Sequence, residues 1–311
     1  MVTPHYYHNP VMTAEVLKAM QVSSGGHYID CTLGEGGHTE VILTASAPDG
    51  KVLGIEADLE ALEVARKRFE KLPSNRVTMV HGSYTNIATI AAGTFSKSIN
   101  GVLMDLGISS FQLESSSRGF TFQKDQPLDM RFNPSQGTTA AEVVNHWTEQ
   151  DLANAIYSYG EERYARQIAH AICVQRPLST TNELTALISN IRKRGPRTPI
   201  HPATRTFQAL RIVVNQEMQN VREGLTQCLS LLEAGARIAV ISYHSLEDRI
   251  IKRFFRDESK SCLCPKEILS CICNHTAKLR IIEKKPVQPT PAEIQVNRRS
   301  RSAKLRVAEI L

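Results

Sequence analysis

The first hundred residues alternate short apolar, β-branched runs with longer stretches of helical composition. Such a repeat, with strand ends about 25 residues apart, predicts right-handed crossovers between parallel strands. The chain is therefore expected to form a doubly wound, Rossmann-like α/β domain. The four expected strands are Tyr28–Cys31, Val52–Glu56, Val77–His81 and Gly101–Asp105, and Leu59–Leu72 is one of the helices between them.

The next buried strand is expected only at Arg237–Ser242, too far along the chain for one ordinary crossover. The residues before it have helical periodicity: Ala165–Ile172 keeps one face apolar, and Thr180 with Glu183 forms a capping box before Leu184–Ile191. We therefore expect an inserted helical subdomain at 112–212.

The α/β domain is then discontinuous and consists of residues 1–111 and 213–311. Val213–Leu232 is expected to be the helix that returns to it, Ile250–Phe255 a later helix, and Leu305–Val307 a last strand.

Composition agrees with a large globular chain: 311 residues, 41% hydrophobic and 22% charged. The apolar runs are too short to span a membrane, and the N-terminus lacks a basic stretch followed by an apolar core, so a cytoplasmic protein is expected. Seven cysteines without a sign of export indicate reduced thiols.

The net charge of +6 is concentrated near the C-terminus, because residues 278–311 contain nine Lys and Arg against three Glu. A second basic cluster comprises Arg192, Lys193, Arg194, Arg197 and Arg205. Two such patches favour a polyanionic partner such as nucleic acid, and the alternative is a solvated surface with a loose tail.

A glycine-rich turn follows the first strand, where Asp30 is succeeded by Cys31-Thr-Leu-Gly34-Glu-Gly36-Gly37-His38. Such a turn admits a ligand close to the backbone, and Glu56 at the end of the second strand can accept hydrogen bonds from ribose hydroxyls. Both features also suit NAD. Thr39 stands where a dinucleotide fingerprint needs a small residue, and Asp30 would repel a diphosphate, so S-adenosylmethionine is favoured over NAD.

Asp105 ends the fourth strand, in the segment Val102-Leu-Met-Asp105-Leu-Gly107-Ile-Ser109-Ser110. The carboxyl ends of parallel strands form the cleft of such a sheet, so this carboxylate is placed to hold a target amine. The alternative is an aspartate that only caps a turn.

Several blocks of the sequence, in order along nearly the whole chain, resemble the RsmH (MraW) family of bacterial small-subunit rRNA (cytosine-N4)-methyltransferases. They are His8–Met12, Tyr28–His38, His81–Tyr84, Asp105–Leu113, Arg118–Phe122, Pro127–Arg131, Tyr159–Arg163, His201–Arg211 and Ile241–Arg249.

This resemblance implies a methyltransferase that uses S-adenosylmethionine to methylate N4 of a cytidine in the decoding region, presented within the assembled small subunit. It implies a cofactor site formed by Gly36, Gly37, His38, Glu56, Tyr84, Asp105 and Gln112. The family usually has Asp in place of Glu56 and often Phe in place of Tyr84, substitutions that keep a carboxylate and a ring. The oligomeric state stays open, a homodimer included.

Asp105 and His244 are the expected catalytic residues. Acceptors on the two amine hydrogens would draw the nitrogen lone pair toward the methyl group, and Asp105 with a backbone carbonyl suits that role. His244 ends the strand after the insertion, and a hydrogen-bonded core histidine is its alternative. Phe111, Phe120 and Phe122 are candidates to stack on the base or to fill the core, and Arg118, Arg131, Arg205 and Arg211 to contact phosphates or to hold the insertion. A non-catalytic RNA-binding protein on the same fold is the competing functional class.

Two Cys-x-Cys pairs, Cys262/Cys264 and Cys271/Cys273, lie in a short loop-like stretch. Four thiolates could close a structural zinc site, but the spacing is less usual than Cys-x-x-Cys. Four reduced loop thiols are therefore expected and no metal is assigned, with zinc left as the alternative.

Overall fold

The computed structural model describes residues 9–73, 75–95, 98–191, 200–265, 267–268 and 270–311. The chain divides into two compact units, which are here called the sheet unit (Met1–Gly107 with Met218–Leu311) and the helical unit (Ile108–Glu217). The boundaries expected from the sequence lie within a few residues of these.

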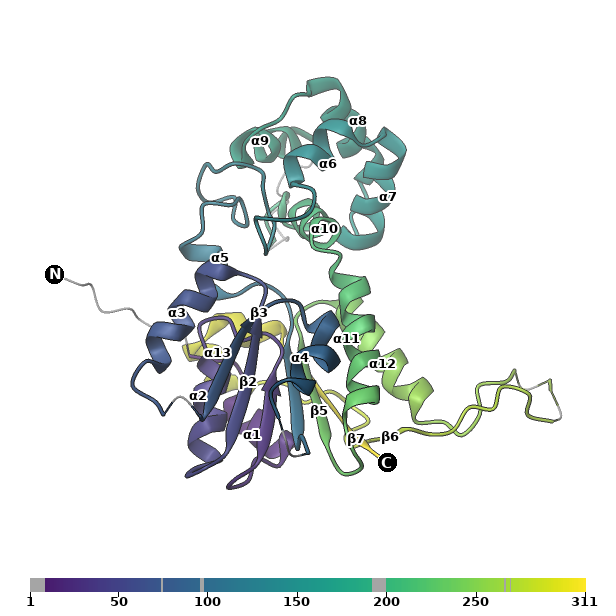
Figure 1. The fold of residues 1–311 in the computed structure, drawn as a ribbon. Helices are drawn as coiled ribbons and strands as arrows, with labels where there is room; N and C mark the ends of the chain where they lie inside the picture. The colour runs from purple at the N-terminus through teal and green to yellow at the C-terminus, as the bar shows by residue number, and fades with distance from the viewer. Residues whose placement is uncertain (1–8, 74, 96–97, 192–199, 266, 269) are drawn as a thin grey trace. The chain divides into compact units, whose positions relative to one another are not determined.

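A seven-stranded sheet forms the centre of the sheet unit, in the order β3-β2-β1-β4-β5-β7-β6 (Figure 1). The first five strands in this order are parallel, and β7 lies antiparallel to both of its neighbours. The predicted doubly wound α/β fold is confirmed. The strands are β1 (His27–Asp30), β2 (Lys51–Glu56), β3 (Val77–His81), β4 (Gly101–Asp105), β5 (Arg237–Ser242), β6 (Leu279–Ile281) and β7 (Lys304–Ile310).

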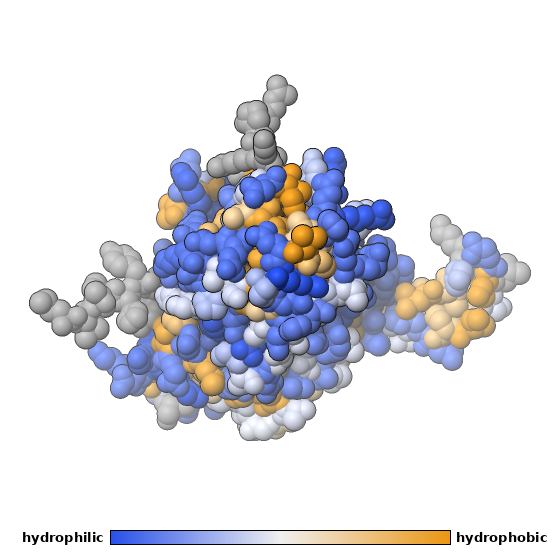
Figure 2. Space-filling model, turned by 90° about the horizontal axis from the view of Figure 1, so that it is seen from above, coloured by the Kyte–Doolittle hydropathy of each residue, from blue (hydrophilic) through white to orange (hydrophobic). Residues whose placement is uncertain are grey.

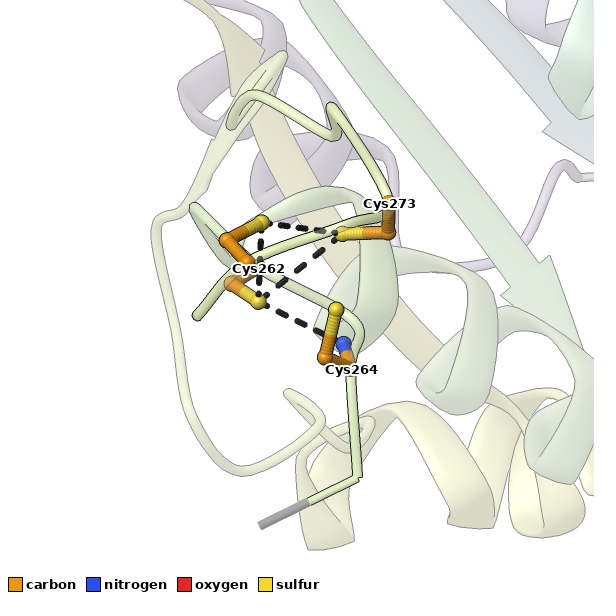
Figure 3. Close-up of side chains that lie close together, drawn as sticks. Cys262, Cys264 and Cys273 are labelled. Atoms are coloured by element: carbon orange, nitrogen blue, oxygen red, sulfur yellow. Dashed lines mark hydrogen bonds between the residues drawn. The ribbon is translucent and has the colours of Figure 1, made fainter. Parts of the chain in front are cut away.

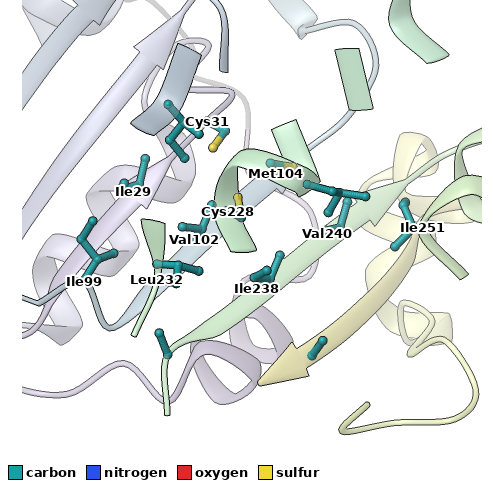
Figure 4. Close-up of a cluster of buried hydrophobic side chains, with 14 of the residues drawn as sticks. Ile29, Cys31, Ile99, Val102, Met104, Cys228, Leu232, Ile238, Val240 and Ile251 are labelled. Carbon is teal, nitrogen blue, oxygen red and sulfur yellow. The ribbon is translucent and has the colours of Figure 1, made fainter. Parts of the chain in front are cut away.

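Helices cover both faces of this sheet (Figure 1). Because successive strand residues point to opposite faces, neighbouring residues belong to different hydrophobic clusters. Ile29, Val102 and Val240 pack with α4, α11 and α12, as Figure 4 shows in part, whereas Tyr28 and Leu103 pack with α1, α2 and α3. The helices are α1 (Thr13–Met20), α2 (Gly37–Ala45), α3 (Leu59–Phe69), η1 (Tyr84–Asn86), α4 (Ile87–Ala92), α11 (Glu217–Leu231), α12 (Ser245–Glu258), α13 (Pro291–Val296) and η2 (Arg298–Ser302).

The helical unit has its own core of buried apolar residues. The expected apolar face at Ala165–Ile172 is buried, and the Thr180/Glu183 capping box forms at the start of α9. Its helices are α5 (Ser110–Glu114), α6 (Ala140–His146), α7 (Glu149–Gly160), α8 (Ala165–Gln175), α9 (Thr181–Ile191) and α10 (Thr204–Val214).

The helix expected over Val213–Leu232 is α11, which begins later than expected, at Glu217. The chain breaks between α10 and α11, where Gln216 takes a left-handed conformation with φ of 51°. The Asn215 side chain bonds the backbone of Arg211, Met130 and Phe132 at 2.7–2.9 Å, and these bonds hold the break in place.

The basic C-terminal residues are folded into the sheet unit, because β6, α13, η2 and β7 all lie within 278–311. The expected last strand at Leu305–Val307 is confirmed as part of β7, and the alternative of a loose tail is wrong. Arg306 of β7 forms an ion pair with Asp248 of α12, with Nε 2.6 Å from Oδ1. Of the helices in the part of the chain that the structure describes, none combines the length and apolarity needed to cross a membrane.

Candidate functional site

The glycine turn after β1 depends on its missing side chains. Gly36 has φ of 85° and precedes the first residue of α2, and a Cβ there would lie 2.5 Å from the Phe69 ring. A Cβ on Gly37 would lie 3.2 Å from Pro10. Only glycine combines the left-handed conformation with this close approach at Gly36.

Asp30 stabilises the glycine turn through two hydrogen bonds. Its fully buried carboxylate accepts hydrogen bonds from the Thr32 amide at 3.2 Å and from the Thr39 hydroxyl at 2.8 Å. Burial raises the pKa of Asp30, against the opposing charge of His38 and these two bonds. In the sequence, Thr39 served only as an argument against NAD. In the structure, its hydroxyl fixes the Asp30 carboxylate, which shapes the turn.

Glu56 lies at the end of β2 and bridges two loops. Its Oε2 accepts from the Gly34 amide at 2.7 Å and its Oε1 from the Asp58 amide at 2.9 Å. Burial raises the pKa of Glu56 to about 7, although these two backbone bonds oppose the shift. Each oxygen keeps a further lone pair, as a carboxylate that receives two ribose hydroxyls would need.

Tyr84 follows β3 in η1 and packs against the hydrophobic cluster that includes Val102 and Val240. A Cβ on Gly224 of α11 would lie 2.6 Å from the Tyr84 ring. The missing side chain at Gly224 therefore sets the position of this ring, which sequence reasoning did not foresee.

Asp105 is held at both carboxylate oxygens at the end of β4. The Tyr243 hydroxyl donates to Oδ1 at 2.8 Å, and Nε2 of His38 lies 3.4 Å from Oδ2. The Thr32 hydroxyl accepts from the Asp105 amide at 2.7 Å. With 23% of its side chain exposed, Asp105 remains accessible while its orientation is fixed.

The charge of Asp105 acts on both of its partners. Burial alone lowers the pKa of His38, but the interaction with the Asp105 carboxylate outweighs it and raises the pKa. Nε2 of His38 lies 3.4 Å from Oδ2 of Asp105 and makes no aligned hydrogen bond with the described residues. Burial and the charge of Asp105 raise the pKa of Tyr243 well above its usual value, so the phenol remains a donor.

Tyr243 was missed by the sequence analysis, which named only its neighbours in the block Ile241–Arg249. The register pairs Asp105 with Ile241, so residues just beyond β5 reach the same sheet edge as the end of β4. That adjacency was the available signal, but it required the pairing of β4 with β5, across the insertion.

His244 is the N-cap of α12. Its Nδ1 accepts from the Glu247 amide at 3.5 Å, and its Nε2 lies 3.1 Å from Oε1 of Glu247. Oε2 of the buried Glu247 accepts from the Tyr243 amide at 2.8 Å and from the His244 amide at 3.3 Å. These contacts form a capping box that also fixes the backbone of Tyr243.

Gln112 belongs to the helical unit, where it is buried in α5. Its Oε1 accepts from the Ser109 amide at 3.0 Å, and the Ser109 hydroxyl accepts from the Gln112 amide at 3.2 Å. This capping box gives Gln112 a local structural role.

The candidate aromatic residues of the helical unit differ in their surroundings. Phe120 is buried and stacks on Phe132 at 5.7 Å between ring centroids. Phe122 stacks on His201 at 4.6 Å and meets the edge of Phe207 at 5.3 Å. These two rings therefore contribute to the core of the helical unit, whereas Phe111 is half-buried.

The candidate arginines bind other parts of the helical unit. Arg131 forms a bidentate pair with Asp129, and Arg211 forms one with Glu217. Arg118 donates to the carbonyl oxygens of Arg131 and Phe132, and Arg205 to that of Glu161, each at 3.0 Å. Each of these bonds links parts of the helical unit. Arg205 also belongs to the second basic cluster of the sequence, whose other members, Arg192, Lys193, Arg194 and Arg197, lie outside the described residues.

Comparison with known proteins gives full-length similarity. The sequence profile of the MraW methylase family matches residues 5–311. The Ribosomal RNA small subunit methyltransferase H of Dehalococcoides mccartyi is 47% identical over 98% of this chain and 86% of its own length. The proteins of that name from Thermomicrobium roseum and Citrifermentans bemidjiense are also 47% identical, over 97% and 98% of this chain and 93% and 98% of their own lengths. The chain therefore belongs to the MraW methylase family.

Proposed function

We propose that this chain transfers a methyl group from S-adenosylmethionine to the exocyclic N4 amine of a specific cytidine in the decoding region of small-subunit rRNA. The observation that carries this proposal is the accessible Asp105 carboxylate at the end of β4, held by Tyr243 and His38. It lies in a chain matched along its length by relatives named Ribosomal RNA small subunit methyltransferase H.

The sheet unit offers donors and acceptors that fit the cofactor. Glu56 would hold the ribose, the backbone at Gly36 and Gly37 would admit the amino-acid part, and Tyr84 would lie beside the adenine. When bound, S-adenosylmethionine supplies an electrophilic methyl group on its sulfonium.

Asp105 is proposed as the catalytic residue. The cytosine amine is conjugated with its ring, and an acceptor on its hydrogens favours the rehybridised nitrogen whose lone pair attacks. Tyr243 and His38 hold the Asp105 carboxylate in one orientation, and a fixed acceptor contributes mainly by alignment.

His244 is proposed as a positioning residue that acts through Tyr243. Its ring is engaged with Glu247, and the same Glu247 carboxylate receives the Tyr243 amide. The capping box of α12 would thus keep Tyr243 directed at Asp105.

The helical unit is proposed to recognise the RNA substrate within the assembled small subunit, in the cytoplasm. The sheet unit is proposed to add contacts to phosphates through exposed basic residues, including Lys284, Lys285, Arg298 and Arg301. A second copy of the chain, as a homodimer, remains a partner to be tested by measuring the mass in solution.

Calorimetry and mass spectrometry test this proposal together. One S-adenosylmethionine should bind per chain, and binding of NAD instead would overturn the proposal. Small-subunit rRNA from cells lacking the gene should lose one methyl group on a cytidine, and the intact gene should restore it.

An Asp105→Ala protein should fold and bind cofactor but fail to restore the methyl group. Restoration of the methyl group would refute the role of Asp105. RNA binding without cofactor binding would instead indicate a non-catalytic RNA-binding protein.

A further inference from the structure

The segment between α12 and β6 projects from the sheet unit (Figure 1) and is here called the cysteine arm, residues 259–277. Its base is closed by the Lys278 amide, which donates to the Glu258 carbonyl at 2.9 Å. None of the described residues of the arm is buried. Leu263, Ile268 and Ile272 are exposed, and Figure 2 shows hydrophobic residues on the surface of this projection. The described residues of the arm therefore form no hydrophobic core that could order it.

Four thiols converge inside this arm. Cys262, Cys264, Cys271 and Cys273 can each offer a sulfur atom, and these atoms all lie within 4.8 Å of one another. Figure 3 shows the side chains of three of these cysteines pointing toward one another. The seven cysteines of the chain are free thiols, so no disulfide holds the four together.

We propose that these four cysteines form a closed structural zinc site, an assignment that does not depend on the proposed methyltransferase activity. The Sγ atom of Cys262 lies 3.4 Å from that of Cys271 and 3.8 Å from that of Cys273, and the last two are 3.5 Å apart. A zinc ion with bonds of about 2.3 Å to four sulfur atoms places neighbouring sulfurs about 3.8 Å apart. Three of the four sulfur atoms already stand near this spacing, and the fourth, on Cys264, lies within 4.8 Å of the others.

Backbone amides surround these sulfur atoms as they would surround thiolates. The Leu263 amide donates to Cys273 at 3.3 Å, the Cys264 amide to Cys262 at 3.4 Å and the Ile272 amide to Cys264 at 3.4 Å. Donors aimed at sulfur disperse the charge of metal-bound thiolates, and such outer contacts orient the ligands. Four ionised thiols this close would repel one another strongly without a cation between them.

The zinc would act as the missing core of the arm. It links both ends of the stretch from Cys262 to Cys273, and small segments without a core depend on such a link. We choose zinc over iron, which also binds four thiolates, because the thiols are half-buried or exposed and zinc has no redox chemistry with which to damage them. This proposal takes up the zinc alternative that the sequence left open, in place of the expected four reduced loop thiols.

Elemental analysis of the full chain, purified without chelator or a metal-affinity column, tests this proposal. One zinc per chain is expected. Less than about one zinc per several chains with all four thiols freely titratable, iron in place of zinc, or disulfides between the pairs would each overturn it. The double variant Cys264→Ser/Cys271→Ser removes one ligand from each pair and should lose the zinc, whereas the control Cys173→Ser, at a half-buried cysteine of α8, should retain it.

A second measurement follows the arm itself. Chelator should release zinc, expose four additional reactive thiols and make residues 259–277 sensitive to protease, while both compact units keep their circular dichroism. Added zinc should reverse all three changes. An arm that resists protease equally with and without chelator would show that zinc does not order it.

Discussion

The hydroxyl of Tyr243, just beyond β5, donates a 2.8 Å hydrogen bond to Oδ1 of Asp105 at the end of β4, across 138 residues of sequence. The bond fixes the orientation of Asp105 and leaves part of its carboxylate exposed. It joins the strand before the insertion to the strand after it, so the proposed catalytic residue depends on both segments of the sheet unit.

Tyr243→Phe removes this bond and keeps the ring. A hydrogen bond to a charged group is worth about 1.5–3 kcal/mol, so kcat should fall about 10- to 100-fold. The Kd for S-adenosylmethionine and the melting temperature should barely change. Tyr157→Phe, on an exposed tyrosine of α7, is the matched control and should be unaffected. An unchanged kcat in Tyr243→Phe would remove Tyr243 from the site.

His244 can be tested by a substitution that preserves the helix cap. His244→Ala should lose about 1 kcal/mol of stability and much of kcat, because the start of α12 and the Tyr243 backbone loosen. His244→Asn keeps a side-chain acceptor at the N-cap and should recover most of both. If His244 took part directly in catalysis, Asn would be as inactive as Ala and the pH profile of kcat would change shape.

Glu56 should make cofactor binding depend on pH. Its pKa is raised to about 7, so the carboxylate loses its charge as pH falls through that value. Ribose hydroxyls are bound best by the ionised form, so the Kd for S-adenosylmethionine should rise between pH 8 and pH 6 by calorimetry. Glu56→Gln should remove this dependence. Glu56→Ala should weaken binding by about 2–4 kcal/mol at pH 8, through two lost bonds to a charged group. A pH-independent Kd in the unmodified protein would contradict this role.

Gly224→Ala should destabilise the protein although alanine favours helices. In an open helix interior the change would stabilise by about 0.5–1 kcal/mol, but here the new Cβ would meet the Tyr84 ring at 2.6 Å. The melting temperature should fall and the Kd for S-adenosylmethionine should rise. In a Tyr84→Ala background the Gly224→Ala change should no longer destabilise, and cofactor binding should remain weak. A stabilised single variant would show that the ring moves freely.

Asp248→Asn should destabilise the sheet unit by about 1–3 kcal/mol in chemical denaturation at pH 7, because it leaves the buried Arg306 without its charge partner. Burial opposes ionisation, but the bond from Arg306 prevails and holds the pKa of Asp248 below its usual value. This contribution is therefore complete above the unfolded pKa and is lost as pH falls through the lower folded pKa. The control Asp257→Asn, on the exposed part of α12, should leave stability unchanged. Equal effects of both changes would contradict the difference in burial.

Local pattern was enough to predict much of this fold. The spacing of apolar runs placed β3, β4 and β5 at their observed bounds, and the cap at Thr180 placed the start of α9. These features depend on residues close in the sequence, where side-chain alternation and capping act directly. The glycine turn, Glu56 and Asp105 were found for the same reason, because each lies where a strand ends.

Tertiary structure decided which distant residues meet. The break at Gln216, the pairing of Tyr243 with Asp105 and the fit of Tyr84 against Gly224 each join segments whose own sequences carry no sign of the partner. The two Cys-x-Cys pairs were visible in the sequence, but only the folded chain shows that their sulfur atoms converge. A last strand at Leu305–Val307 was expected, but its antiparallel place between β5 and β6 was not. Sequence patterns record local preference for strand, helix or turn, whereas strand order and packing arise from burying apolar surface across the whole unit, and only the folded chain specifies them.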